Sequence, residues 1–322
     1  MNGRLGHHRS GIRMNFDRVL KPILTEFKAR QPMRAKSLII TLFGDVVSQH
    51  EKEIWLGSVS EALRDLGISD RLVRTSVFRL VSEGWLDGGR EGRRSFYRFS
   101  AFGSQEYQRA AQRIYSITSD PWRGRWQLLF PTDVPDTLRD DLRRSLHWLG
   151  FRAISPGAYA RPGGDLGSVR DLLDEFSLEK GVIVMDGVSS PVTSKNELKR
   201  TVNKHWELDK LAEDYALLIK RFRPLNQVLE KGTSPAPAEA FLARLLLIHD
   251  YRRILLRDTP LPDDLLPSRW SGTTAKHLVG ALYRQLTAPS LLYIRERLMN
   301  QRGPLPSPNR LFFERFAEQG DC

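Results

Sequence analysis

The chain has 322 residues, enough for two or three domains with buried cores, and its 40% hydrophobic and 27% charged residues are typical of a globular protein. Fifty Lys and Arg against 38 Asp and Glu give a net charge of +12, which favours a polyanion, although a solvated basic surface is an equal interpretation of charge alone. The single cysteine, Cys322, excludes an intrachain disulfide and a cysteine-based zinc site. Without a bilayer-spanning apolar run or a secretory signal, the chain is expected to be cytoplasmic and not to enter a membrane.

Residues 1–31 are predicted to form a basic tail and a short amphipathic helix. Pro22 interrupts the apolar pattern of that helix, and proline lacks the N–H that a helix interior uses. The apolar residues at helical spacing are Phe16, Leu20, Ile23, Leu24 and Phe27.

Residues 32–100 are predicted to form a winged helix-turn-helix domain. The pattern indicates helices at 33–48, 57–66 and 70–83, with a strand-like segment at 53–56. Gly67 would end the second helix and Ser69 would cap the third. A glycine- and arginine-rich turn at 88–94, followed by alternation over 95–99, predicts a β-hairpin. Its glycines join two strands and no Lys-Ser/Thr pair follows them, which argues against a nucleotide-binding loop.

The helix at 70–83 is predicted to have an apolar face and a basic face. The residues expected to pack inward are Val73, Val77, Leu80 and Val81. On another face, at i, i+3, i+4 and i+7, are Arg71, Arg74, Thr75 and Phe78. Two arginines and a threonine there would meet guanine edges, phosphates and a thymine methyl in the major groove. A solvated face with exposed arginines is the alternative.

The hairpin strengthens the DNA interpretation because Arg90, Arg93 and Arg94 crowd one turn. Their mutual repulsion needs an anion, which DNA phosphate or the minor groove supplies. The candidate DNA-binding residues are Ser69, Arg71, Arg74, Thr75, Phe78, Arg79, Arg90, Arg93, Arg94 and Tyr97.

The rest of the chain is predicted to contain a linking helix in 101–121, a middle domain at 122–192 and an all-helical domain at 193–322. The middle domain would follow the ferredoxin-like order βαββαβ, with elements at 125–130, 134–148, 149–154, 157–161, 165–177 and 181–186. The later helices are expected at 196–222, 238–257, 272–287 and from about 289. The fold class is therefore α+β and multidomain.

Several segments together resemble the PaaX family of phenylacetate-catabolism repressors. The N-terminal ones are Leu42-Phe43-Gly44-Asp45, Glu53-Ile54-Trp55-Leu56-Gly57-Ser58, Val73-Arg74-Thr75-Ser76-Val77-Phe78-Arg79-Leu80, Glu83-Gly84-Trp85-Leu86 and Gly92-Arg93-Arg94-Ser95-Phe96-Tyr97. The later ones are Trp148-Leu149-Gly150-Phe151, Phe222-Arg223-Pro224-Leu225, His249-Asp250-Tyr251-Arg252-Arg253, Leu261-Pro262-Asp263-Asp264-Leu265-Leu266-Pro267 and Leu311-Phe312-Phe313-Glu314-Arg315-Phe316. These segments extend over residues 37 to 316 in the family's order.

The resemblance implies a bacterial repressor with a winged-helix head, a middle domain like the CRISPR Cas2 proteins and a helical C-terminal domain. It implies double-stranded operator DNA as partner, no cofactor, and release from DNA by phenylacetyl-CoA or a related aryl-CoA. A homodimer is expected, because one small head rarely reaches the affinity a repressor needs.

For the effector, a cationic group beside aromatic rings suits the phosphates and the ring of an acyl-CoA. The candidate effector-binding residues are Trp206, His249, Tyr251, Arg252, Arg253 and Trp270. The structural alternative is a hydrogen-bonded core histidine, buried core tryptophans, and ion pairs of Arg252 or Arg253 with Asp258, Asp263 or Asp264.

Enzyme activity is not expected, since the sequence has no nucleophile elbow, paired metal-ligand histidines or phosphate loop. Two alternatives remain: a constitutive architectural DNA-binding protein without effector and, more remotely, a metal-dependent nuclease like some Cas2-fold proteins, although a fold does not confer an activity.

Overall fold

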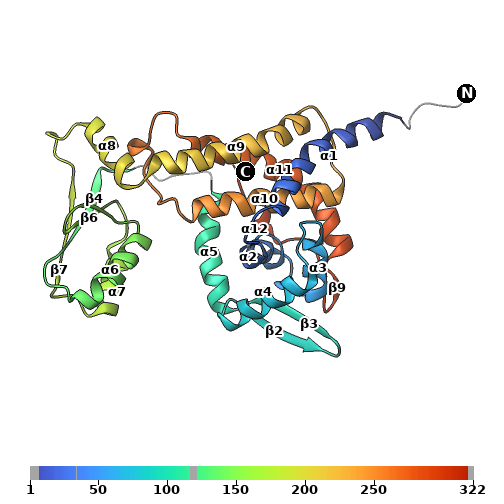
Figure 1. Cartoon of the computed structure of the whole chain (residues 1–322), viewed down its shortest axis with the longest axis horizontal. Helices are drawn as coiled ribbons and strands as arrows, with labels where there is room; N and C mark the ends of the chain where they lie inside the picture. The colour runs from blue at the N-terminus through green and yellow to red at the C-terminus, as the bar shows by residue number, and fades with distance from the viewer. Residues whose placement is uncertain (1–6, 34, 117–121, 318–322) are drawn as a thin grey trace, which may run out of the picture. The chain divides into compact units, whose positions relative to one another are not determined.

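The computed structural model describes residues 7–33, 35–116 and 122–317, with side chains from Phe16 onward. It combines helices with small antiparallel sheets, in agreement with the predicted α+β class. The chain divides into two compact units (Figure 1). Unit 1 comprises Met1–Ile117, Tyr215–Leu256 and Thr273–Cys322, and unit 2 comprises Thr118–Asp214 and Arg257–Gly272. Residues predicted within the single range 193–322 thus contribute to both units.

The N-terminal part of unit 1 contains three helices and a three-stranded antiparallel sheet of order β1-β3-β2. Its elements are α2 (Ala35–Asp45), the 3-10 helix η1 (Val47–Gln49), β1 (Glu53–Trp55), α3 (Leu56–Arg64), α4 (Asp70–Ser82), β2 (Leu86–Glu91) and β3 (Arg94–Phe99). The three helices and the hairpin lie close to where the sequence predicts them.

The hairpin turn is shorter than predicted. Glu91 pairs with Arg94, so β2 includes most of the predicted turn at 88–94. Glycine is suited to this strand because the facing aromatic rings occupy the space of a side chain: a Cβ on Gly89 would lie 2.2 Å from the ring of Phe96. The predicted hairpin is confirmed, but the prediction that its glycines at 88 and 89 belong to the turn is wrong, because they lie in strand β2.

Helices from both ends of the sequence surround α10 (Pro237–Leu255), which is buried on nearly all sides from Ala240 to Ile254. A helix that is buried all round forms the centre of a core. The other elements of this part are α1 (His7–Lys28), α5 (Ala101–Tyr115), most of α9 (Leu208–Glu230), most of α11 (Ser271–Arg297), β8 (Met299–Asn300), β9 (Gly303–Pro304) and α12 (Arg310–Phe313). α10 contacts α1, α2 and α5.

Three predictions for the C-terminal region are wrong. The helix predicted at 196–222 is two helices, α8 (Lys195–His205) and α9, because Glu207 adopts a left-handed conformation with φ of 51°. The helices predicted on either side of residue 288 are one helix, α11, in which burial of Leu286 and Ile294 outweighs the hydrogen bond lost at Pro289. The range is also not all-helical, since β8 and β9 form a hairpin too short to leave a periodic pattern.

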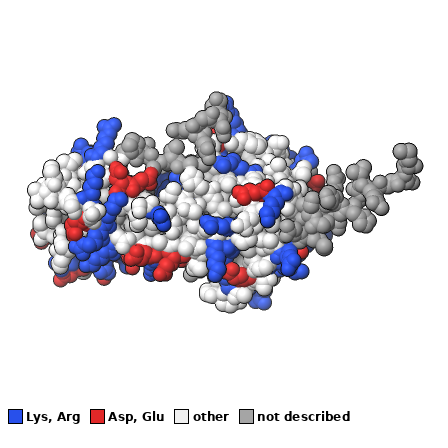
Figure 2. All heavy atoms as spheres, turned by 90° about the horizontal axis from the view of Figure 1, so that it is seen from above, with Lys and Arg blue, Asp and Glu red and all other residues white. Residues whose placement is uncertain are grey.

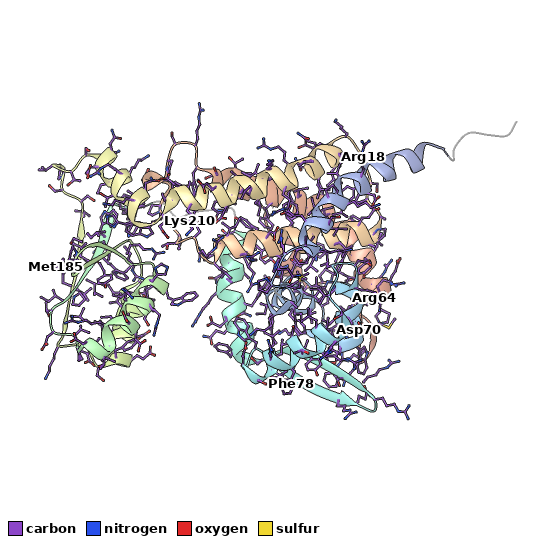
Figure 3. The ribbon with its side chains drawn as sticks, viewed as in Figure 1. Arg18, Arg64, Asp70, Phe78, Met185 and Lys210 are labelled. Carbon is purple, nitrogen blue, oxygen red and sulfur yellow. The ribbon has the colours of Figure 1, made fainter. Side chains whose placement is uncertain are left out.

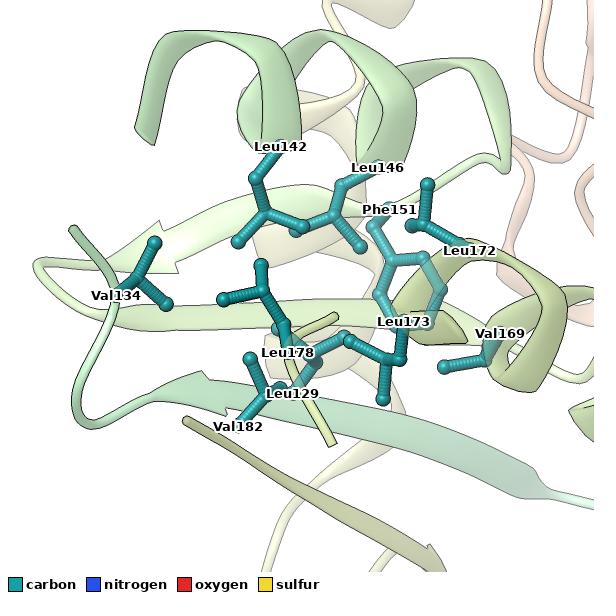
Figure 4. Close-up of a cluster of buried hydrophobic side chains, with 10 residues drawn as sticks. All are labelled: Leu129, Val134, Leu142, Leu146, Phe151, Val169, Leu172, Leu173, Leu178 and Val182. Atoms are coloured by element: carbon teal, nitrogen blue, oxygen red, sulfur yellow. The ribbon is translucent and has the colours of Figure 1, made fainter. Parts of the chain in front are cut away.

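Unit 2 has the predicted βαββαβ order. Its elements are β4 (Arg125–Pro131), α6 (Asp136–Trp148), β5 (Arg152–Ser155), β6 (Ala158–Pro162), α7 (Leu166–Phe176) and β7 (Val182–Val188), followed by α8 and the 3-10 helix η2 (Asp263–Leu265). The four strands are antiparallel in the order β5-β6-β4-β7. Leu142 and Leu146 of α6 and Leu173 of α7 pack against Leu129 of β4 (Figure 4). Both helices therefore cover the same face of the sheet.

Candidate nucleic-acid interface

Local interactions set both ends of α4. Ser69 is the N-cap, as predicted, and its Oγ accepts a hydrogen bond from the N–H of Leu72 at 3.3 Å. At the other end, the N–H groups of Gly84 and Trp85 donate to the carbonyls of Val81 and Leu80 at 3.0 and 2.8 Å. This is a Schellman motif, and glycine supplies its left-handed residue with φ of 76° at Gly84. The helix is thereby limited to residues 70–82.

One face of α4 packs into unit 1. Val73, Val77 and Leu80 are buried as predicted, and Ser76 is buried with them. Val81 was predicted to pack inward, but it is 36% exposed. At 100° per residue, Val81 and Ser76 lie at the two edges of the buried face, and only the edge that carries Ser76 is covered.

The opposite face of α4 is exposed and basic. It carries Arg71, Arg74, Thr75, Phe78 and Arg79. The guanidinium groups of Arg71 and Arg74 form no ion pair or hydrogen bond with any other residue that the structure describes. Thr75 Oγ1 donates to the carbonyl of Arg71 at 2.9 Å, so its hydroxyl proton is already used. These two arginines are therefore available to an external anion.

The hairpin carries the second group of candidate residues. Arg90, Arg93 and Arg94 are exposed, and the Arg94 guanidinium lies 5.4 Å from the centre of the Trp55 ring. Tyr97 is half-buried, with its ring against Gly88. The hairpin therefore presents arginines at its tip on a sheet held together by aromatic side chains.

A buried carboxylate anchors α2, which contacts α4, to the rest of unit 1. Asp45, the last residue of α2, is fully buried and lies 3.0 Å from a guanidinium nitrogen of both Arg244 and Arg315. The hydroxyls of Tyr115 and Tyr283 each donate to Asp45 Oδ1 at 2.9 Å. Asp45 thus joins α2 to α5, α10, α11 and the segment after α12.

Burial by itself would raise the pKa of Asp45, but the two arginines and the two tyrosine hydroxyls together lower it. The carboxylate therefore stays ionised within the core. Sequence reasoning missed this cluster because its members are up to 270 residues apart. The motifs Leu42-Phe43-Gly44-Asp45 and Leu311-Phe312-Phe313-Glu314-Arg315-Phe316 were the available signal, and each contributes one charged member.

The six candidate effector residues do not form one cluster within either unit. His249, Tyr251, Arg252 and Arg253 lie on α10 in unit 1, whereas Trp206 and Trp270 belong to unit 2. Trp206 is buried, packs against Trp126 at 6.3 Å between ring centres, and donates from Nε1 to the carbonyl of Gly150 at 3.3 Å. Trp270 is 8% exposed.

On α10, the candidate residues contact α2. His249 is buried with its Nδ1 3.3 Å from Thr41 Oγ1. Because the Thr41 hydroxyl donates to the carbonyl of Ser37, Nδ1 of His249 must donate to Thr41. Arg252 donates to the carbonyl and hydroxyl of Ser37 at 3.3 and 3.4 Å. The contact of His249 matches the structural alternative of a hydrogen-bonded core histidine. The contacts of Arg252 differ from that alternative, because Arg252 hydrogen-bonds to Ser37 of α2 and not to one of the predicted aspartates.

Asp250 was not predicted as a partner of this region. It accepts two hydrogen bonds from Arg30, at 2.6 and 2.9 Å, and one from Arg221 at 2.9 Å. Arg221 also pairs with Glu26 of α1. α1, α9 and α10 are therefore tied together by charge. On the face drawn in Figure 2, Lys and Arg side chains lie beside Asp and Glu side chains.

Unit 1 also has a polar cavity of about 440 Å³. It is lined by Ser48, Gln49, Glu51, Lys52, Glu53, Asn300, Gln301, Arg302 and Asn309. None of the six effector candidates lines it. Among the described residues, no three His, Cys, Asp or Glu side chains are grouped to hold a metal ion, and no helix is long and apolar enough to cross a membrane.

Three family models match consecutive parts of the chain. They are the PaaX-like protein model at residues 34–103, the PaaX protein central Cas2-like domain at 119–199 and the PaaX-like protein C-terminal domain at 206–296. The chain is 38% identical to the transcriptional repressor PaaX of Escherichia coli over 89% of its own length and 91% of that protein. The chain therefore belongs to the PaaX family.

A solved structure is similar in fold. It is an uncharacterized protein from Mycobacterium tuberculosis, 20% identical, with a TM-score of 0.51 over 79% of this chain and 98% of that one. At this identity the similarity concerns the fold alone.

Proposed function

We propose that the chain is a DNA-binding transcriptional repressor of phenylacetate catabolic genes that reads its operator with residues 32–100, folded as a winged helix. The observation that carries the proposal is the exposed face of α4, where Arg71 and Arg74 have no protein partner in the described part of the chain. The arginine-rich hairpin follows α4 directly. Contacts to base edges give sequence specificity, whereas contacts to phosphates fix the position of a protein on DNA. In this proposal α4 contacts the bases and the hairpin contacts the DNA backbone. The name of the Escherichia coli relative supports the same function.

Under this proposal the chain acts in the cytoplasm as a homodimer, with one head on each half of an inverted repeat. The ranges 1–31, 101–121 and 122–192 serve as tail, linking helix and Cas2-like domain, and the effector binds within the C-terminal range 193–322, which is divided between the two units. Sedimentation of the free protein and of its DNA complex tests the dimer. A monomer protecting one unrepeated site would contradict it.

The proposed effector is phenylacetyl-CoA or a close aryl-CoA. Support comes from α10, because His249 and Arg252 hydrogen-bond to Thr41 and Ser37 of α2, and α2 packs against α4. A ligand that shifts α10 would therefore act on the DNA-reading helix through direct contacts. A coupling of about 1–3 kcal/mol between ligand and DNA is sufficient for such regulation.

Fluorescence anisotropy of a labelled promoter fragment tests both parts of the proposal. The full-length chain should bind the fragment, and phenylacetyl-CoA should release it whereas free phenylacetate should not. The free acid has too few atoms to supply the differential binding free energy that a population shift requires. Absence of promoter binding would overturn the proposed repressor function. Promoter binding that no acyl-CoA reverses would overturn the proposed effector.

A constitutive DNA-binding protein without effector is the alternative that the burial of α10 leaves to be tested. Arg252→Ala separates the two. If Arg252 binds effector, more acyl-CoA is needed for release while the thermal melt stays normal. If Arg252 is structural, its contacts to Ser37 are lost and the melting temperature falls.

A further inference from the structure

Phe78 lies at the centre of the exposed face of α4. The buried positions Val73, Val77 and Leu80 mark the inner side of the helix. At 100° per residue, Phe78 is on nearly the opposite side from their mean direction, and it is 71% exposed. Figure 3 labels Phe78, further along α4 than Asp70. The phenyl ring thus projects outward from the middle of the helix.

At this exposure the ring contributes little to the core. Within the described residues Phe78 pairs with no other aromatic ring, whereas the nearby Trp85 and Phe102 pack edge to face at 5.6 Å. An exposed phenylalanine forgoes the free energy that burial would give. A single exposed apolar side chain is common on protein surfaces, so the role of Phe78 depends on the side chains that share its face.

The neighbours of Phe78 identify the chemistry of that partner. Arg74 and Arg71 lie about one and two turns before it on the same face. Ser82 Oγ donates to the carbonyl of Phe78 at 3.1 Å, as Thr75 does to Arg71, so neither hydroxyl offers its proton outward. The face therefore presents the guanidinium groups of Arg71, Arg74 and Arg79 around an apolar centre. The major groove presents the matching set, with guanine acceptors and phosphates around the C5-methyl group of thymine.

We propose that Phe78 determines operator specificity by packing its ring against a thymine C5-methyl group in each half-site. The inference rests on the proposed DNA-binding function and adds a residue that reads an apolar group. Phe78→Ala then loses preference at one base pair, while the arginines keep the remaining contacts.

The test removes single methyl groups from the DNA. An operator is first selected from a random-sequence pool with the full-length chain, and each thymine is then replaced in turn by deoxyuridine. One position per half-site should weaken binding by about fourfold, the value of one buried methyl group. Phe78→Ala should bind the thymine and uracil operators equally. Phe102→Ala, which removes another exposed phenylalanine of unit 1, should keep the wild-type discrimination.

A gain-of-methyl experiment completes the test. When that thymine is changed to cytosine, 5-methylcytosine at the same position should recover about fourfold for the wild type and nothing for Phe78→Ala. Wild-type binding that is indifferent to every deoxyuridine overturns the inference but leaves DNA binding intact. Failure to select any operator overturns the proposed function itself. A change of oligomeric state in Phe78→Ala, with discrimination retained, assigns the ring to a protein contact and also overturns the inference.

Discussion

Arginines serve opposite purposes in two regions of unit 1. Arg71, Arg74, Arg90 and Arg93, the outer arginines, are exposed and form no ion pair or hydrogen bond with other residues of the described ranges. Arg244, Arg252 and Arg315, the buried arginines, each contact α2 through Asp45 or Ser37. The same side chain is thus a free ligand for an anion in one region and a structural link in the other.

The physical difference is the cost of desolvation. A buried guanidinium requires a counter-charge or hydrogen bonds, because removal from water costs several kcal/mol. An exposed one keeps its hydration and carries its charge to a partner at little cost to the fold. The buried arginines therefore stabilise the fold, whereas the outer arginines are available for binding.

The largest expected effect comes from removing the counter-charge of the buried arginines. Asp45→Asn leaves Arg244 and Arg315 in the core without a carboxylate and should lower the free energy of unfolding by about 3–5 kcal/mol. Urea unfolding measures the loss. Glu26→Gln, which removes a half-exposed partner of Arg221, should cost less than about 1 kcal/mol. Equal effects of the two substitutions would show that burial does not raise the cost of removing the counter-charge of an arginine.

Removal of an outer arginine should affect DNA and leave the fold unchanged. Arg74→Ala should weaken operator binding by about 1–3 kcal/mol, the value of a bidentate base contact, with a wild-type melt. Arg109→Ala is the control, because Arg109 is also exposed but paired with Glu106 on α5. A well-folded Arg74→Ala protein with unchanged operator affinity would refute the role assigned to α4.

The buried region should also respond to pH. Burial lowers the pKa of His249 from 6.5 to about 3. The unfolded chain therefore binds a proton at His249 as the pH falls through 6.5, while the folded chain does not, so folding becomes less stable. The loss between pH 7 and pH 5 should be about 2 kcal/mol for this group.

Urea unfolding at the two pH values checks this expectation. His249→Gln should reduce the pH dependence by about that amount, and His277→Gln, at an exposed position of α11, should leave it unchanged. The same pH dependence in all three proteins would mean that His249 is protonated as easily in the core as in water.

The smallest expected effect concerns the tip of the hairpin. Arg93→Ala combined with Arg94→Ala should weaken specific and random DNA alike, because these side chains are expected to meet phosphate. The slope of log affinity against log salt should fall by about 0.9 for each lost contact. An unchanged slope would mean that the hairpin does not contact DNA and that α4 alone forms the interface.

Prediction from sequence succeeded where local chemistry decides the structure. The cap at Ser69, the helix after it, the hairpin and the βαββαβ order of unit 2 all follow from periodicity, capping and turn residues. It failed at Trp206, where the helix predicted at 196–222 is interrupted and Trp206 packs against Trp126, and at Pro289, where packing keeps α11 continuous. In both places distant side chains override the local preference.

By itself, the sequence determined that a basic helix and a basic hairpin stand side by side in the chain, since spacing and turn residues act over a few positions. Which arginines are free was decided only by the tertiary structure. Arg74 and Arg244 both lie on helices with apolar neighbours, yet one faces solvent and the other faces Asp45, 199 residues away in sequence. The physical reason is that burial and ion pairing depend on which segments pack together, and this is a property of the whole fold rather than of any local pattern.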